Sequence, residues 1–320
     1  MNDFLHFLET SYTAYQAAEN ARTLLQAHGF RELDEGAPWD LQPQGKYFVV
    51  RGGSAVIAFV CGDAKKGFKI AASHLDSPCL KLKENPALSD GHCTRLNAEP
   101  YGGGIWHTFF DRPLRLAGRV VREENGALRA LPFASDFLVS LPSLAIHLDR
   151  EVNEKFAPNL QENLPLLTLG QKDFYDLLRG PVSYDLYAAC AEKPYFWGAD
   201  GEFLSSPRLD DLASAYASLH TLAETPCDGV CVAACLDAEE IGSRTRQGAG
   251  GDFLRAVLAR IAQAQSLTQA DYYAALAASF CISIDNAQGF HTNYPAKFDP
   301  SDRAYLGKGV ALKSHAGGAY

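Results

Sequence analysis

Residues 230–243 read Val-Cys-Val-Ala-Ala-Cys-Leu-Asp-Ala-Glu-Glu-Ile-Gly-Ser, and this stretch is the most informative part of the chain. An apolar run of strand length ends at Asp237, two adjacent carboxylates follow at Glu239 and Glu240, and Gly242 favours a turn. Open α/β sheets build their sites at the carboxyl ends of strands. One carboxylate of such a pair can hold a metal while its neighbour handles a proton. Taken alone, a Glu-Glu pair is more often a solvated turn.

The elements expected around this stretch predict an α/β domain with an insertion. In chain order they are a helix over 13–29 with a possible capping box at Thr13-Ala-Tyr-Gln16, two strands within 46–60, a strand over 68–73, a helix from 209, a strand over 230–237, helices near 251–263 and 267–278, and a strand over 279–284. Proline, glycine and short β-branched runs dominate between about 79 and 197. We therefore expect an α/β domain over 1–78 and 198–320, interrupted by a β-rich domain over 79–197.

Composition narrows the partners that the chain can have. With 47% hydrophobic and 21% charged residues, the 320-residue chain can bury a sizeable core. Its net charge of −9 argues against nucleic acid or an anionic membrane as the main partner. No apolar run reaches the roughly 18 residues of a transmembrane helix. The N-terminus lacks the basic segment of a signal peptide.

The cysteine pattern favours free thiols in a reducing cytoplasm. Eight cysteines are scattered along the chain, several of them inside apolar runs. Cys227, Cys231 and Cys235 are spaced by four, but no histidine or Cys-x-x-Cys pair accompanies them. We interpret all eight as buried free thiols rather than as a zinc cluster or a disulfide framework.

Four fragments place an acidic or imidazole group at the end of an apolar strand or loop. They are His74-Leu-Asp76, Asp210, Glu239-Glu240 and Asp285. Mixed histidine and carboxylate ligands suit zinc or a related divalent ion. A carboxylate shared by two ions gives the arrangement that hydrolyses amides, and Asp76 stands where it can orient the imidazole of His74.

Each fragment also has an ordinary structural interpretation. A lone histidine after a strand is more often a hydrogen-bonded packing residue, Asp210 can cap the helix that it precedes, and Asp285 can begin a turn. A chance placement of all four fragments at strand ends is less probable than a chance placement of any one of them. The joint pattern therefore favours a metal site.

Six motifs together resemble the M18 family of aspartyl aminopeptidases, in that family's order and over almost the whole chain. They are His74-Leu-Asp-Ser-Pro78, Tyr101-Gly-Gly-Gly-Ile-Trp106, Phe110-Asp-Arg112 with Leu116-Ala-Gly-Arg-Val120, Leu144-Ala-Ile-His147-Leu148, Arg208-Leu-Asp-Asp-Leu212 and Asp237-Ala-Glu-Glu-Ile-Gly-Ser243. The set is highly specific, although no single motif would be.

The resemblance implies a zinc-peptidase-like mixed sheet flanked by helices and interrupted by a β-rich dimerisation domain. It also implies a cytoplasmic, dodecameric enzyme that uses two Zn²⁺ ions to remove N-terminal Asp or Glu from peptides. In that scheme Asp210 bridges the two ions, His74 and Asp285 complete one, and Glu240 serves the other. Glu239 is the general base, and Asp76 is assigned to the catalytic group with it.

Substrate-binding positions follow from the same resemblance. His147 matches a residue that the family supplies from a neighbouring subunit, although alone it would be a core histidine. Lys313 and Tyr320 match positions that touch substrate, and a lysine suits an acidic side chain as its counter-charge. By itself Lys313 would be an ordinary surface lysine.

The chain departs from the family pattern in two places. Gln288 stands where the family has an imidazole that contacts substrate, so we expect weaker transition-state stabilisation without loss of metal. An unchanged turnover of an Asp-peptide by Gln288→His would contradict this. The family also continues beyond Tyr320 to a final histidine ligand for the ion at Glu240. We therefore expect one tightly held metal and poor hydrolysis, which two tightly bound zinc ions per chain would refute.

Two other functions remain open from the sequence. One is a di-zinc carboxypeptidase or deacylase with the same catalytic domain, against which Lys313 and the insertion speak. The other is a truncated or catalytically impaired M18-like subunit that acts through assembly. Gln288 and the early end favour this alternative, whereas the intact Glu239-Glu240 pair speaks against it.

Overall fold

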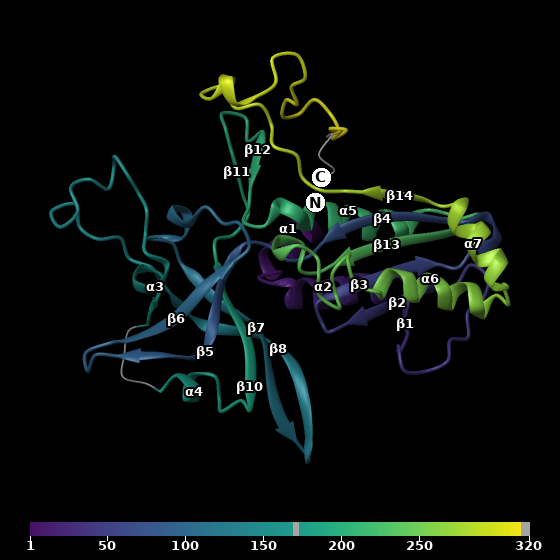
Figure 1. Ribbon diagram of the computed structural model, residues 1–320, viewed down its shortest axis with the longest axis horizontal. Coiled ribbons are helices and arrows are strands. Elements are labelled where there is room, and N and C mark those ends of the chain that lie inside the picture. The colour runs from purple at the N-terminus through teal and green to yellow at the C-terminus, as the bar shows by residue number, and fades with distance from the viewer. Residues whose placement is uncertain (169–172, 315–320) are drawn as a thin grey trace.

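The computed structural model describes residues 1–168 and 173–314, and two large sheets organise them (Figure 1). The first sheet has the strand order β1-β2-β3-β13-β4-β14. These strands are β1 (Arg31–Glu32), β2 (Lys46–Arg51), β3 (Ala55–Val60), β13 (Val230–Leu236), β4 (Phe68–His74) and β14 (Phe280–Ser283). Strand β4 is parallel to both of its neighbours, β13 and β14. The carboxyl ends of these three strands therefore meet at one edge of the sheet.

Helices cover both faces of the first sheet. They are α1 (Asn2–Thr10), α2 (Ala14–Ala27), α5 (Leu209–Glu224), α6 (Phe253–Ala264) and α7 (Gln269–Ala277). Side chains alternate along a strand, so β3 contributes Val56, Ala58 and Val60 to the core under α1, α2 and α5. Its other residues, Ile57 and Phe59 among them, belong to the core under α6 and α7. The result is a three-layer arrangement with β3 and β13 buried at its centre.

The second sheet is antiparallel and has the order β8-β7-β10-β5-β6-β9. Its strands are β5 (Cys79–Ser89), β6 (Thr94–Tyr101), β7 (Leu114–Glu124), β8 (Ala127–Val139), β9 (Leu166–Thr168) and β10 (Ser183–Cys190). A separate apolar core, which includes Leu80, Leu116 and Leu186, packs against it. Gly118 is required in β7, because a Cβ there would lie 2.1 Å from the carbonyl oxygen of Asp185.

Polar contacts from α2 join the first layer to the second sheet. The Tyr15 hydroxyl donates to Asp185 Oδ2 at 2.6 Å, and Lys81 Nζ lies 3.0 Å from Asp185 Oδ1. The Gln16 amide donates to the carbonyl oxygens of Gly118 and Phe133. These contacts fix the second sheet beside the helix that opens the chain.

Short elements complete the described residues. They are the helices α3 (Leu160–Asn163) and α4 (Phe174–Leu177), the 3₁₀ turns Ala64–Lys66, Trp106–Phe109, Glu239–Ile241 and Pro295–Lys297, and the two strands β11 (Tyr195–Trp197) and β12 (Phe203–Ser205). Strands β11 and β12 form a hairpin that projects on the same side as the C-terminal segment (Figure 1). Within the described residues, no helix is both long and apolar enough to cross a membrane.

The structure confirms the predicted fold class, a mixed sheet flanked by helices and interrupted by a β-rich segment. Every element expected from the sequence in the first layer is present, and α1 and β1 are additions. At the start of α2, Thr13 accepts from the Tyr15 backbone N–H, whereas Gln16 reaches the second sheet instead of completing a capping box.

The interpretation of all eight cysteines as buried free thiols is wrong for five of them, and Cys93 and Cys190 are free but only partly buried. Cys227 and Cys231 form a disulfide across the turn that leads into β13. Cys281 is exposed, because every described residue of β14 lies at the edge of the sheet with its side chain accessible. Spacing by four in an apolar sequence does not show that a turn brings two sulfurs together, and strand-like composition does not show which strand lies at an edge.

Candidate active site

Four elements bring the site together at the carboxyl edge of the first sheet. His74 is the last residue of β4, and it pairs in register with Leu236 at the end of β13. Asp285 lies two residues after the end of β14, and Asp210 lies at the start of α5. In the chain, β4 precedes α5, β13 and β14 by more than a hundred residues. The parallel pairing of β4 with β13 and β14 brings the ends of these strands together.

Carboxylates surround the imidazole of His74. Its Nε2 lies 3.3 Å from Asp210 Oδ1, 3.9 Å from Asp285 Oδ1 and 3.9 Å from Glu239 Oε2. On the other side of the ring, Nδ1 lies 3.0 Å from the Asp76 carbonyl oxygen and 3.4 Å from Asp76 Oδ1. Asp76 therefore orients the ring so that Nε2 faces the acidic groups.

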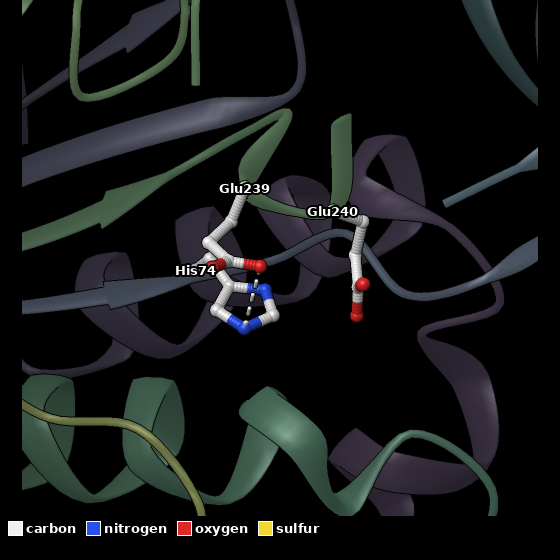
Figure 2. A group of neighbouring side chains, drawn as sticks. All are labelled: His74, Glu239 and Glu240. Atoms are coloured by element: carbon white, nitrogen blue, oxygen red, sulfur yellow. Dashed lines mark ion pairs between the residues drawn. The ribbon is translucent and has the colours of Figure 1, made fainter. Parts of the chain in front are cut away.

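A single tight turn presents Glu239 and Glu240. Figure 2 shows Glu239 extending from this turn over the ring of His74, with Glu240 beside it. Ala238 before it has φ +62° and Gly242 after it has φ +95°, so the backbone is left-handed on both flanks. For Ala238 that conformation costs about 1–3 kcal/mol, a strain that is typical of functional sites. Asp76 stabilises the turn, since Oδ1 accepts from the Glu239 N–H and Oδ2 from the Glu240 N–H, both at 3.1 Å.

The crowding of acidic groups changes their protonation. Burial alone would lower the pKa of His74, but hydrogen bonds to Asp210 and Asp76 outweigh it and raise the pKa to about 11. Burial raises the pKa of Glu240 to about 7, and neighbouring carboxylates add to this effect against the opposing charge of His74. The hydrogen bond with His74 lowers the pKa of Asp210. The cluster holds more negative charge than its one imidazole can balance.

A cleft of about 450 Å³ opens over these groups. Its walls come from the ends of β4 and β13 and from the segment that follows β14, and they include His74, Glu239 and Asp285. Two sets of side chains at the site have ligand atoms within 4.8 Å of one another. The first set is His74, Asp210 and Asp285, and the second is His74, Glu239 and Glu240.

Comparison with known proteins decides the family. The family model described as "Aminopeptidase I zinc metalloprotease (M18)" matches residues 7–176 and 178–320. The "Probable M18 family aminopeptidase 2" of Clostridium acetobutylicum is 37% identical over 340 residues, which cover 99% of this chain and 78% of that protein. This chain belongs to the M18 family of zinc aminopeptidases.

Two further relatives agree with that assignment. "Aspartyl aminopeptidase 1" of Schizosaccharomyces pombe is 35% identical over 99% of this chain and 76% of its own length. A solved structure, described as "Cryo-EM structure of the Ape4 and Nbr1 complex", superposes with a TM-score of 0.90 at 33% identity, covering 96% of this chain and 67% of that one. The family resemblance that the sequence motifs carry is confirmed.

The residues present fit the zinc of an M18 enzyme. Zinc is typically held by histidine nitrogen and carboxylate oxygen in a compact group of three or four ligands. His74, Asp210 and Asp285 offer that donor set, with the three ligand atoms already close together. The predicted pairing of Glu240 with Asp210 for a second ion is less direct, because the second compact set joins Glu240 to His74 and Glu239.

The four predicted substrate-binding residues lie in different surroundings. Lys313 is at the site, with Nζ 3.2 Å from Asp285 Oδ2 and 3.2 Å from the Asn286 carbonyl oxygen. Gln288 is exposed and lines a neighbouring hollow of about 600 Å³ that Lys313 shares. His147 is exposed in a turn after the strands of the second sheet, outside the cleft. Tyr320 lies outside the described residues.

Two residues that contact this site were not singled out from the sequence. Asp211, which is fully buried, accepts from the His74 backbone N–H at 3.2 Å, and burial raises its pKa to about 7. Tyr101 comes from the second sheet, and its hydroxyl donates to Asp76 Oδ2 at 2.8 Å. In the sequence, Asp211 directly follows the predicted ligand Asp210, and this is only a weak indication that it belongs to the site. For Tyr101 the only signal was its place at the head of a family motif.

Proposed function

We propose that this M18 aminopeptidase removes N-terminal acidic residues from peptides with the help of zinc. His74, Asp210 and Asp285 would hold one ion tightly, and Glu240 together with Asp210 would hold a second ion only weakly. The observation that carries the proposal is the convergence of Asp210 and Asp285 on Nε2 of His74, inside an open cleft at three parallel strand ends. Bound zinc polarises the scissile carbonyl and makes the attacking water more acidic.

Glu239 is the proposed general base. Its carboxylate lies on the cleft wall with its side chain about half exposed, so a water and a peptide can both reach it. Burial raises the pKa of Glu239 above its ordinary value, and this makes it a better proton acceptor. Glu239 takes the proton from the attacking water and then delivers it to the leaving amine. Asp76 fixes the backbone from which Glu239 projects.

Lys313 supports a preference for acidic side chains. Its ammonium lies next to Asp285 at the mouth of the site, where a carboxylate on the substrate's first residue can approach it. A relative with 35% identity has the name aspartyl aminopeptidase, which agrees with this preference. Gln288 contributes a neutral amide to the adjoining hollow, in place of a group that could carry a proton.

Self-association and a cytoplasmic location complete the proposal. One solved structure with a similar fold is described as "Structure of S. cerevesiae mApe1 dodecamer". In this chain the segment around His147 exposes Leu144, Ile146 and Leu148, with exposed fractions of 60%, 46% and 74%. Large apolar side chains grouped in this way are typical of contact surfaces between proteins. Six cysteines are free thiols, which a reducing compartment allows, whereas the Cys227–Cys231 disulfide does not support this location.

The test combines substrate comparison with metal analysis. The full chain is assayed with the p-nitroanilides of Asp, Glu and Leu, and its zinc content is measured after dialysis. We expect kcat/KM for the Asp and Glu substrates to exceed that for Leu by at least about tenfold, since an ion pair to Lys313 is lost with Leu. Lys313→Met, which keeps the length of the stem, removes this difference. A better turnover of the Leu substrate contradicts the specificity, and a chain that retains no zinc contradicts the mechanism.

A further inference from the structure

We propose that Tyr101 is a positioning residue of the active site, which holds Asp76 and through it the Glu239-Glu240 turn. The inference rests on the proposed roles of those residues, and it gives the second sheet a part in catalysis. Tyr101 is the last residue of β6, where it pairs in register with Cys79 at the start of β5. Among the described residues of the second sheet, Tyr101 is the one whose side chain donates a hydrogen bond to Asp76.

The hydrogen bonds of Asp76 show why its position matters. Only 3% of this residue is exposed, and both of its carboxylate oxygens have protein partners. Oδ1 accepts from the Glu239 N–H and faces His74 Nδ1, whereas Oδ2 accepts from the Glu240 N–H and from the Tyr101 hydroxyl. The Tyr101 contact, at 2.8 Å, is the shortest of these four. A buried carboxylate that loses one partner moves to find another or weakens its remaining bonds.

The residue after Tyr101 is also shaped by the site. Gly102 has φ +75°, and a Cβ added there would lie 2.9 Å from Cβ of Glu240. The second sheet therefore acts on the turn at two consecutive residues, through Asp76 by the Tyr101 hydroxyl and directly by the Gly102 backbone against Glu240. Two independent contacts at consecutive residues fix the place of the turn relative to His74.

The ring of Tyr101 packs independently of its hydroxyl. Its centroid lies 5.4 Å from that of Tyr187 in an edge-to-face arrangement within the second sheet. Tyr101→Phe therefore removes the bond to Asp76 while it keeps this packing. Groups that orient metal ligands, as Asp76 orients His74, contribute about 10- to 100-fold to metal affinity or activity, and Tyr101 acts through Asp76.

The experiment compares Tyr101→Phe with a matched control in the full chain. Tyr184→Phe also removes a bonded phenol hydroxyl from the second sheet, but that hydroxyl donates to the Lys83 carbonyl oxygen, away from the site. For each variant kcat and KM are measured on Asp-p-nitroanilide, zinc affinity by chelator competition, and the midpoint of thermal unfolding. We expect Tyr101→Phe to lower kcat and zinc affinity about 10-fold or more with KM unchanged, and Tyr184→Phe to change neither.

A double-mutant cycle separates positioning from a general structural effect. In an Asp76→Ala background, Tyr101→Phe should reduce zinc affinity much less than in the wild type, because the residue through which it acts is gone. An equal reduction in both backgrounds overturns the proposal. So does a loss of thermal stability with unchanged kcat and zinc affinity. Wild-type protein that binds no zinc overturns the proposed function together with this inference, whereas equal zinc binding by wild type and Tyr101→Phe overturns the inference alone.

Discussion

Glu239 and Glu240 are adjacent in the chain, yet Glu239 is the proposed general base and Glu240 a proposed metal ligand. A single substitution can separate these two roles. Glu239→Gln keeps the size of the side chain and removes its ability to accept a proton. We expect kcat to fall about 10²- to 10⁴-fold, the range for loss of a general base, with KM and zinc content unchanged. Turnover of Asp-p-nitroanilide and metal analysis measure these quantities. Glu224→Gln, at the exposed far end of α5, is the matched control.

A loss of zinc together with activity in Glu239→Gln would make Glu239 a ligand, in agreement with the compact set that it forms with His74 and Glu240. At this scale the sequence predicts where residues at strand ends lie, because parallel strands end at a common edge. His74 and Asp285 are such residues. It cannot place Lys313, whose partner Asp285 precedes it by 28 residues of irregular chain. Nor can it pair Cys227 with Cys231, since that depends on the shape of one turn.

Helix α2 and strands β5 and β10 meet at one partly buried carboxylate, that of Asp185, and this contact should make the stability of the fold depend on pH. Burial would raise the pKa of Asp185, but the hydrogen bond from Tyr15 and the charge of Lys81 outweigh it and lower the pKa. A lowered pKa stabilises the fold above the unfolded value of about 3.9, and this stabilisation is lost as the pH falls through the folded pKa. Tyr15→Phe should therefore cost about 1–3 kcal/mol of unfolding free energy at pH 7 and clearly less at pH 3.

Urea unfolding at the two pH values measures that cost, with Tyr273→Phe on the exposed face of α7 as the control. An equal loss at pH 7 and pH 3 would show that the contribution of the Tyr15 hydroxyl does not depend on the charge of Asp185. The elements themselves followed from the sequence wherever apolar periodicity was strong, as in β3, β13 and α5. Their pairing did not, because the order β3-β13-β4-β14 joins strands that are distant in the chain. The contacts of Gln16 with the second sheet could not be predicted from the sequence, because their partners Gly118 and Phe133 are also distant in the chain.

At the scale of the whole molecule, the site holds together segments from both ends of the described chain, and their carboxylates repel one another without a cation. Zinc that binds only the folded state stabilises it by about 2.7 kcal/mol at a hundred times its dissociation constant. We therefore expect EDTA to lower the midpoint of thermal unfolding by several degrees, and added Zn²⁺ to restore it. Mg²⁺, which prefers oxygen ligands and octahedral geometry, is the control and should restore little. Hydrogen exchange after EDTA should rise first at residues 208–212 and 236–243, where the ligands and the strained turn lie, and last in β3. A uniform rise across both sheets, or a midpoint that EDTA leaves unchanged, would show that the acidic cluster is stable without metal. The convergence of Asp210 and Asp285 on His74 would then not be a zinc site in this chain.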